Sequence, residues 1–119
     1  MSSKKILIVE DDAFIVEALS MVLSDEGYDV ASSTDGEIFS KPHFEHPDLI
    51  LLDIRLSGID RRDLCKWLKE HPDMKHIPVI LLSGNRDIES IHKECGAEDY
   101  MVKPFDLTDL LSKISIYCN

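Results

Sequence analysis

Long apolar runs, cysteine pairs and positive charge are all scarce in this sequence of 119 residues. No hydrophobic stretch approaches the roughly 20 residues of a membrane span, and the start does not resemble a signal peptide. The three cysteines, Cys65, Cys95 and Cys118, form no Cys-x-x-Cys pair, which argues against a disulfide framework and favours a reducing compartment. Lys and Arg number 13 against 23 Asp and Glu, and the formal net charge of −10 argues against binding to nucleic acid or to an anionic membrane. We therefore expect a cytoplasmic protein that uses neither as a partner.

Hydrophobic residues make up 44% of the chain, which is enough to build one core. Apolar runs at 5–9, 49–52 and 77–82 have the length of strands buried on both faces of a parallel sheet, and weaker candidates lie at 28–33 and 100–102. Between them, apolar residues recur with helical period over 15–23, 64–71, 88–95 and 107–114, and a short, poorly patterned helix is expected between Asp35 and Pro42. This alternation predicts an α/β, doubly wound parallel sheet. We expect a single domain over residues 1–119, with no output domain.

Polar residues of a particular kind stand at the ends of the expected strands. Glu10 and Asp11 follow the first, Asp53 ends the third, Ser83 ends the fourth and Lys103 follows the fifth. Because the carboxyl ends of parallel strands meet at one edge of the sheet, these five side chains should lie together. Any one of them could merely end a strand, but five such residues favour a shared site.

This set of residues suits the chemistry of phosphate. Clustered carboxylates raise one another's pKa unless a cation neutralises them, and Mg²⁺ prefers oxygen ligands. A carboxylate beside Mg²⁺, with a hydroxyl and an ammonium group nearby, has the parts needed to attack phosphorus and to hold an acyl phosphate. Asp53, Ser83 and Lys103 would supply those groups.

Four segments, in order, resemble the motifs of the response-regulator receiver domain of two-component signalling systems. They are ILIVEDD at 6–12, DLILLD at 48–53, LLSG at 81–84 and GAEDYMVKPF at 96–105. The resemblance covers essentially the whole chain. It implies a flavodoxin-like (βα)5 fold with five parallel strands in the order 2-1-3-4-5.

The resemblance also implies roles for the acidic residues. Asp53 would accept a phosphoryl group from a phosphohistidine on a sensor histidine kinase or a histidine phosphotransfer protein. Asp11, Asp53 and the backbone carbonyl of Arg55 would bind Mg²⁺, with Glu10 acting mainly through water. Asp12 ranks below Glu10 and Asp11 as a member of this cluster.

By the same resemblance, Lys103 would pair with the phosphoryl oxygens and Ser83 would move to hydrogen-bond one of them. Tyr100 matches the aromatic residue that turns inward with Ser83, and the Lys103–Pro104 peptide is expected to be cis. Arg55 and Asn85 would tune the lifetime of the phosphorylated state.

The loop after Asp53 departs from the family pattern. Ser57 stands where proline is common, and Arg61 stands where glycine is usual. The conformation of this loop is therefore the least predictable part of the site.

The resulting hypothesis is a phosphorylation-dependent signalling switch. Its only chemistry would be its own phosphorylation and dephosphorylation, so we do not expect an enzyme. The state would pass to an effector or output domain through the fourth helix, fifth strand and fifth helix, about residues 88–116, where Lys93 or Lys113 could contact a partner. A homodimer could form on phosphorylation.

Three alternatives belong to other classes of protein. A phosphorylation-independent docking or dimerisation module would not need the intact acidic, hydroxyl and lysine set. A phosphatase of the haloacid-dehalogenase type would need Asp-x-Asp, but Arg55 fills the second position. A flavodoxin-like cofactor binder would carry a Ser/Thr/Gly phosphate loop after its first strand, where this chain has three carboxylates.

Overall fold

Five parallel strands form the central sheet of the computed structural model, which describes residues 3–34, 37–40, 45–56, 59–84 and 86–118. The strands lie in the order β2-β1-β3-β6-β7. Their bounds are Lys5–Val9 (β1), Asp29–Ser33 (β2), Leu49–Asp53 (β3), Val79–Ser83 (β6) and Asp99–Val102 (β7). Numbered along the chain within this sheet, the order is 2-1-3-4-5, as predicted.

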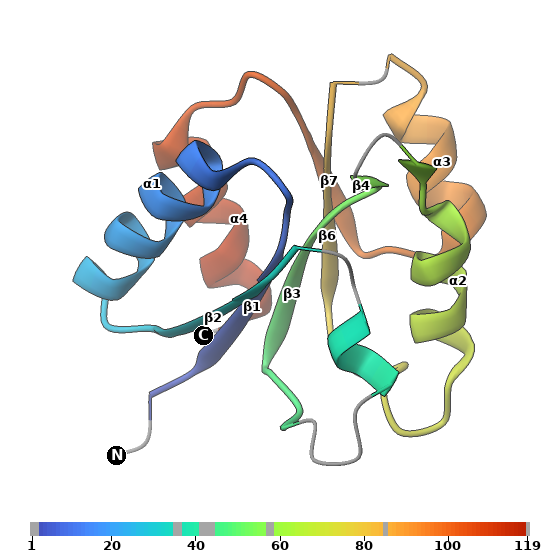
Figure 1. Ribbon diagram of the computed structural model, residues 1–119, viewed down its shortest axis with the longest axis horizontal. Coiled ribbons are helices and arrows are strands. Elements are labelled where there is room, and N and C mark those ends of the chain that lie inside the picture. Colours follow the sequence, from blue (N-terminus) through green and yellow to red (C-terminus); the bar gives the residue numbers. More distant parts are fainter. Residues whose placement is uncertain (1–2, 35–36, 41–44, 57–58, 85, 119) are drawn as a thin grey trace.

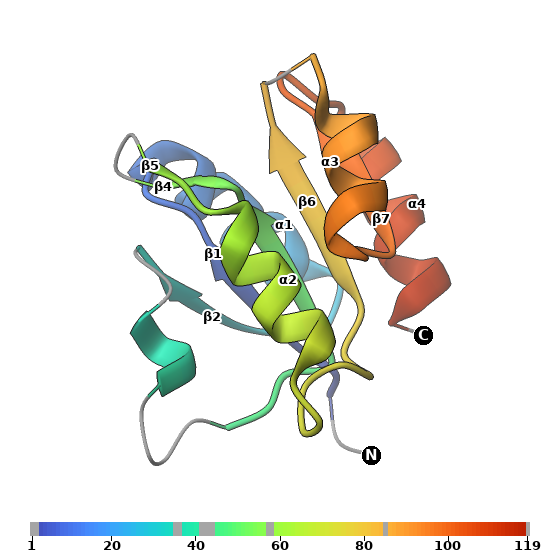
Figure 2. The same ribbon diagram turned by 90° about the vertical axis from the view of Figure 1, so that its right-hand side faces the viewer.

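Helices cover both faces of the sheet (Figures 1 and 2). One face carries α1 (Ala13–Asp25) and α4 (Leu107–Tyr117), and the other carries α2 (Arg62–Glu70) and α3 (Ile88–Cys95). The apolar periods in the sequence therefore predicted four helices correctly.

Two short segments go beyond the expectation. Between β2 and β3, where a short, poorly patterned helix was expected without a stated type, the described residues form a 3₁₀ helix, η1 (Glu37–Ser40). Four residues give too few i→i−4 hydrogen bonds for a stable α-helix, and proline is not tolerated in the interior of an α-helix. A short 3₁₀ helix is therefore the form available to this segment. The expected ends of this helix, Asp35 and Pro42, lie outside the described residues. The second segment is an unpredicted antiparallel pair, β4 (Arg55–Leu56) and β5 (Ile59–Asp60), after the central strand.

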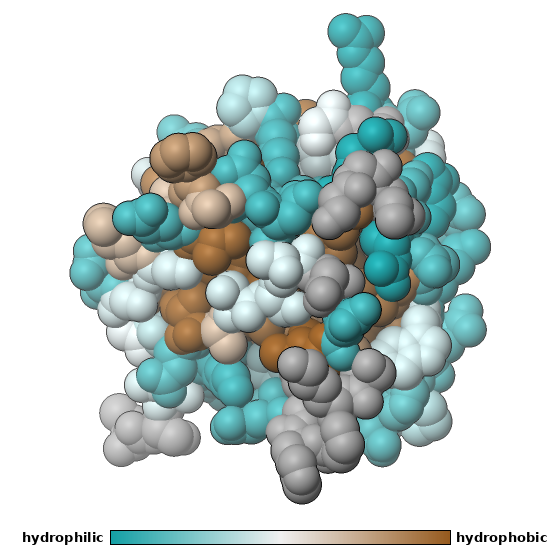
Figure 3. Space-filling model, viewed as in Figure 1, coloured by the Kyte–Doolittle hydropathy of each residue, from teal (hydrophilic) through white to brown (hydrophobic). Residues whose placement is uncertain are grey.

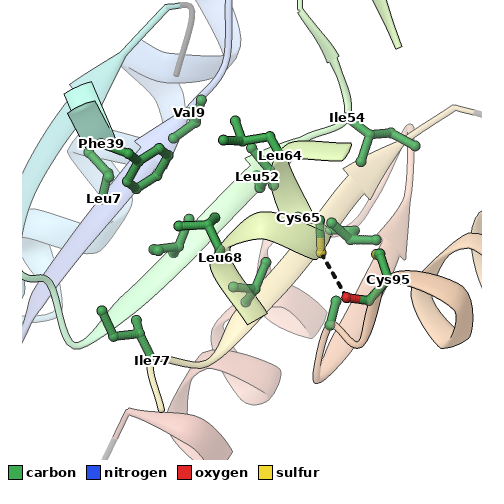
Figure 4. Packing of buried hydrophobic residues seen from close by; sticks show 14 of the residues in the cluster. Leu7, Val9, Phe39, Leu52, Ile54, Leu64, Cys65, Leu68, Ile77 and Cys95 are labelled. Carbon is green, nitrogen blue, oxygen red and sulfur yellow. Dashed lines mark hydrogen bonds between the residues drawn. The ribbon is translucent and has the colours of Figure 1, made fainter. Parts of the chain in front are cut away.

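The alternation of side chains along the strands divides the core into two clusters. Ile6 and Ile8 of β1 pack with α1 and α4, whereas Leu7 and Val9 pack on the side of α2 and α3. Figure 4 shows the second cluster, in which the Cys65 thiol points to the backbone carbonyl of Cys95 at 3.8 Å. β3 is buried at every position because both of its faces are covered. Each fully buried aliphatic side chain contributes about 1.5–3 kcal/mol to the free energy of unfolding, relative to the same side chain exposed to water.

Local capping marks the starts of α1 and α4 and the end of α3. The carboxylate of Asp12 accepts the backbone N–H groups of Phe14 and Ile15, and that of Asp106 accepts the N–H of Thr108 at 2.7 Å. These side chains satisfy donors that the first turn leaves without partners. Gly96 ends α3 in the left-handed conformation, with φ 83°.

A partly buried ion pair connects the end of α2 with the starts of two strands at the amino-terminal edge of the sheet. Lys69 Nζ, on the last turn of α2, lies 2.8 Å from the Glu98 carboxylate and donates to the carbonyl of Ile77 at 2.9 Å. Glu98 also accepts the N–H of Val79, the first residue of β6, at 2.8 Å. The pair, which we call the Lys69–Glu98 clamp, therefore ties α2 to the starts of β6 and β7.

The Gly96→Ala variant should unfold with a free energy about 1 kcal/mol lower than that of the wild type. A Cβ at this position would meet Lys69 Cβ at 3.5 Å, an ordinary contact, so the cost comes from the left-handed backbone. Urea denaturation measures the change. Gly96→Asn should cost less, because asparagine tolerates this conformation better, and an equal cost for both would contradict the explanation.

The face seen in Figure 3 is mostly hydrophilic, with hydrophobic side chains gathered mainly toward the side where α1 and α4 lie. Phe14 and Met21 of α1 are 85% and 63% exposed. An apolar hollow of about 420 Å³ is lined by Ile15, Ala18 and Leu19 of α1 and by Lys103, Pro104, Phe105 and Leu107. Within the described residues, no helix combines the length and apolar character needed to cross a bilayer.

Candidate functional site

The carboxyl ends of the strands bring the predicted polar residues together. In the parallel register Val9 lies opposite Leu52, Asp53 opposite Leu82 and Ser83 opposite Val102. Residues at or just after these positions therefore meet at the upper edge of the sheet in Figure 1. They are Glu10, Asp11, Asp53, Ser83 and Lys103.

Three carboxylates form the centre of this site. Ligand atoms of Glu10, Asp11 and Asp53 all lie within 4.8 Å of one another. Glu10 is completely buried and Asp53 is 4% exposed, whereas Asp11 faces solvent. Asp53 Oδ1 accepts the N–H of Arg55 at 2.9 Å, so the backbone after β3 fixes one oxygen of the carboxylate.

Lys103 bridges the two buried carboxylates. Its Nζ lies 2.6 Å from Glu10 Oε1 and 2.9 Å from Asp53 Oδ2. Burial would lower the pKa of Lys103, but the hydrogen bonds to both carboxylates outweigh it and raise the pKa above its usual value. The backbone N–H of Lys103 donates to the carbonyl of Ser83 at 2.8 Å, and the Lys103–Pro104 peptide bond is cis.

The site is suited to a hard cation. Burial, the hydrogen bond with Asp53 and the charge of Asp53 raise the pKa of Glu10 to about 7, although Lys103 acts in the opposite direction. Two buried carboxylates beside one ammonium group therefore leave an excess of negative charge. An all-oxygen donor set with this excess fits Mg²⁺ or Mn²⁺, with Glu10, Asp11 and Asp53 as the residues that could hold the ion.

A cavity of about 390 Å³ opens beside Asp53, and it offers space for a tetrahedral group next to the carboxylate. Ser83, 5% exposed, lies in its wall with Lys103. Among the described residues, the lining consists of Asp53, Ile54, Arg55, Asp60, Ser83, Gly84 and Lys103.

The other predicted residues lie around this centre in different ways. Arg55 is exposed and lines the cavity, whereas Asn85 lies outside the described residues. Asp12 caps α1. Tyr100 is half-buried, with its ring centroid 5.1 Å from that of His92 and 5.7 Å from Lys113 Nζ. Tyr100 therefore packs between α3 and α4, outside the lining of the cavity.

Asp60 is a cavity residue that sequence reasoning missed. It belongs to the two-residue strand β5, which is too short to give a periodic pattern. The antiparallel register places Asp60 opposite Arg55, which brings its carboxylate to the wall of the cavity. A carboxylate near the first turn of a helix would otherwise indicate only a capping residue.

Metal-free protein should lose stability as the pH rises from about 5 to about 7 because of Glu10. Its pKa rises from 4.5 to about 7 on folding, so the folded state binds the extra proton in this window, and the stabilisation is lost as the pH passes the folded value. We expect the free energy of unfolding of the wild type to fall by on the order of 2 kcal/mol more than that of Glu10→Gln. Thermal unfolding of both proteins in EDTA across this pH range measures the difference. An equal change of stability with pH in both proteins would contradict the prediction.

Comparison with known proteins identifies the family. The profile of the response regulator receiver domain matches residues 6–115, nearly the whole chain. The chain belongs to the response regulator receiver family. Its members are in general signalling switches of two-component systems rather than enzymes.

Individual relatives of this receiver domain agree in sequence and in structure. The DNA-binding response regulator MtrA of Mycobacterium tuberculosis is 34% identical over 114 residues, which cover 93% of this chain and 49% of MtrA. The receiver domain of a signal transduction histidine kinase from Syntrophus aciditrophicus is 35% identical, with a TM-score of 0.86 and coverage of 97% of this chain and 89% of that one. The Mn²⁺-bound form of response regulator Rcp1 is 28% identical, with a TM-score of 0.77 and coverage of 93% and 88%.

The relatives bear on two expectations about this receiver domain. The chain spans about half the length of the curated relatives that it matches. Because MtrA is a DNA-binding regulator, the expectation of no nucleic-acid partner finds no support in the comparisons. The metal in Rcp1 agrees with a cation at the acidic pocket of receiver domains.

Proposed function

We propose that this receiver domain accepts a phosphoryl group on Asp53 from a phosphohistidine and relays its phosphorylation state to a partner. The observation that carries the proposal is the environment of Asp53. Its carboxylate contacts Lys103 at 2.9 Å, shares a potential metal site with Glu10 and Asp11, and lines a cavity beside Ser83. In the transfer, the P–N bond of the donor breaks, a P–O bond to Asp53 forms, and the leaving imidazole keeps the electron pair and takes up a proton.

The residues around Asp53 would have different roles in the phosphoryl transfer. Glu10, Asp11, Asp53 and the backbone carbonyl of Arg55 would hold Mg²⁺, which supplies neutralisation of negative charge on the phosphoryl oxygens. Lys103 would exchange part of its contact with the carboxylates for a phosphoryl oxygen. The hydroxyl of Ser83 would donate a hydrogen bond to another. Arg55 and Asn85 would set how readily water reaches the acyl phosphate.

The partner would read the α3–β7–α4 face, residues 88–116. Inward rotation of Tyr100 would break its ring contact with His92 and its contact with Lys113. Lys113 is also paired with Asp99 at 2.8 Å, so the rotation would leave that pair as the main contact of the lysine. Movement of one aromatic ring would thus alter the surface between α3 and α4, where an output domain or a second receiver could bind.

Intact mass spectrometry tests the proposal. The protein is incubated with Mg²⁺ and a small acyl phosphate, or with a phosphorylated histidine phosphotransfer protein, and EDTA is the control. We expect a gain of one phosphoryl group that is absent in EDTA. No gain from either donor, under conditions in which calorimetry confirms Mg²⁺ binding, would contradict the function and favour a docking module.

A further inference from the structure

The β4–β5 pair forms one wall of the cavity beside Asp53. Arg55 and Asp60, which face each other in the antiparallel register, both line it. Two hydrogen bonds donated by backbone N–H groups, one to a side chain and one to a carbonyl, connect this pair to the end of the central strand. The N–H of Arg55 donates to Asp53 Oδ1, and the N–H of Arg61 donates to the carbonyl of Ile54. The position of the Arg55 backbone relative to Asp53 therefore depends on how firmly β5 is held.

Arg62, the first residue of α2, holds β5 through the Asp60 carboxylate. Its Nη2 lies 2.8 Å from Asp60 Oδ2, its Nε lies 3.2 Å from the same oxygen, and its backbone N–H donates to Oδ1 at 3.0 Å. The hydrogen bond from Arg62 keeps the pKa of Asp60 below its usual range, so the carboxylate stays charged at neutral pH. One residue thus contacts both carboxylate oxygens from its side chain and its backbone.

The same guanidinium reaches α3. Nη1 of Arg62 lies 3.6 Å from Glu94 Oε2, and Lys66 lies 3.2 Å from the other oxygen of Glu94. A cation in the first turn of a helix is unfavourable beside the positive end of the helix dipole. Its contacts with Asp60 and Glu94 offset that cost. They also connect the cavity wall to the two helices behind it.

The exposure of Arg62 and Asp60 indicates whether their contact acts on global stability or on local geometry. The side chains of Arg62 and Asp60 are 39% and 40% exposed, and half-exposed ion pairs contribute little to global stability. A forked contact of this kind does, however, fix the orientation of a carboxylate and of the backbone that carries it. Its effect should therefore be local to the cavity wall.

We propose that Arg62 is a positioning residue for the phosphoacceptor site: by clamping Asp60, it holds the β4–β5 pair so that the Arg55 backbone stays in place beside Asp53. The inference rests on the proposed function, since the Arg55 carbonyl is a ligand only if the site binds Mg²⁺. The contact between Arg62 and Asp60 itself exists without the metal. The two parts can therefore be tested separately.

The first test uses metal-free protein and measures amide hydrogen exchange by NMR. In Arg62→Met, the amides of Arg55 and Arg61 should exchange about 5-fold faster than in the wild type, because the restraint on β5 is lost. The amide of Lys103, which bonds to Ser83 at the same edge of the sheet, should not change. Arg62→Lys keeps the charge but not the fork, so it should also exchange faster.

Lys66→Met is the matched control, because it removes a positive charge that contacts Glu94 rather than Asp60. Its Arg55 and Arg61 amides should exchange as in the wild type. The proposal would be overturned if these amides exchanged at the wild-type rate in both Arg62 variants. It would also be overturned if Lys66→Met accelerated their exchange as much as Arg62→Met does.

The second test measures Mg²⁺ binding by calorimetry. Residues that orient metal ligands typically change affinity by 10-fold or more, and we expect Arg62→Met and Arg62→Lys to bind Mg²⁺ about 10-fold more weakly than Lys66→Met. Equal affinities in all three variants would overturn the link between the Arg62–Asp60 contact and the binding of the metal. Absence of Mg²⁺ binding in the wild type would instead contradict the proposed function, and the exchange data would still decide whether Arg62 holds the wall.

Discussion

The Asp53→Asn variant should gain no phosphoryl group under conditions in which the wild type is fully phosphorylated. Asparagine keeps the size of the side chain but lacks the nucleophilic oxygen, so we expect the mass gain to fall below detection, a loss of more than about 100-fold. The fold should persist, because Glu10 keeps its 2.6 Å contact with Lys103 and the crowding of two buried carboxylates is relieved. Intact mass spectrometry measures the first effect and thermal unfolding the second.

Asp12→Asn provides the matched control for this loss. Asp12 lies next to the acidic cluster in sequence, but its carboxylate accepts the N–H groups that begin α1, a role that asparagine fills equally well. We expect Asp12→Asn to be phosphorylated to the same extent as the wild type. Phosphorylation of Asp53→Asn at wild-type level would show that another residue accepts the group.

Breaking the Lys69–Glu98 clamp should produce the largest loss of stability. Lys69 is 10% exposed at its side chain, and Glu98→Gln would leave its ammonium without a carboxylate. Removing one partner of a buried pair typically costs 3–5 kcal/mol, and the partial exposure of Glu98 reduces our expectation to about 2–3 kcal/mol. For a domain of this size, the melting temperature should fall by roughly 10 °C.

A double-mutant cycle separates the pair from its surroundings. Lys69→Met alone should also destabilise, but Lys69→Met combined with Glu98→Gln should lose less than the sum, because neither charge is then left unpaired. Glu89→Gln is the control, since the Glu89–Lys93 pair is 66–71% exposed and should contribute below about 0.5 kcal/mol. Strict additivity of the two clamp variants would contradict the interpretation.

The sequence predicted the parts of the fold that depend on long periodic patterns. The apolar run that ends at Asp53 is a strand buried throughout, and the helical period over 88–95 corresponds to the helix α3 (Ile88–Cys95). The meeting of Glu10, Asp53 and Lys103 followed from parallel strands alone, and the distances of 2.6 and 2.9 Å agree with it.

The sequence was least informative where structure depends on contacts between distant or very short segments. The β4–β5 pair has two residues per strand, so no period could reveal it, and Asp60 was missed for that reason. The Lys69–Glu98 clamp joins residues 29 positions apart, and a lysine and a glutamate in a charged chain carry no local signal of pairing.

The Lys69–Glu98 clamp and the residues of the proposed phosphoacceptor site lie at opposite edges of the sheet, which matters for protein engineering. Lys69, Glu98 and Val79 lie where β6 and β7 begin, whereas Ser83 and Lys103 lie where these strands end. Thermal stability can therefore be changed at one edge of the sheet without altering the sequence at the edge that carries the proposed phosphorylation site. In a receiver domain built in this way, substitutions for stability and substitutions at the proposed phosphorylation site can be made in separate rounds of mutagenesis.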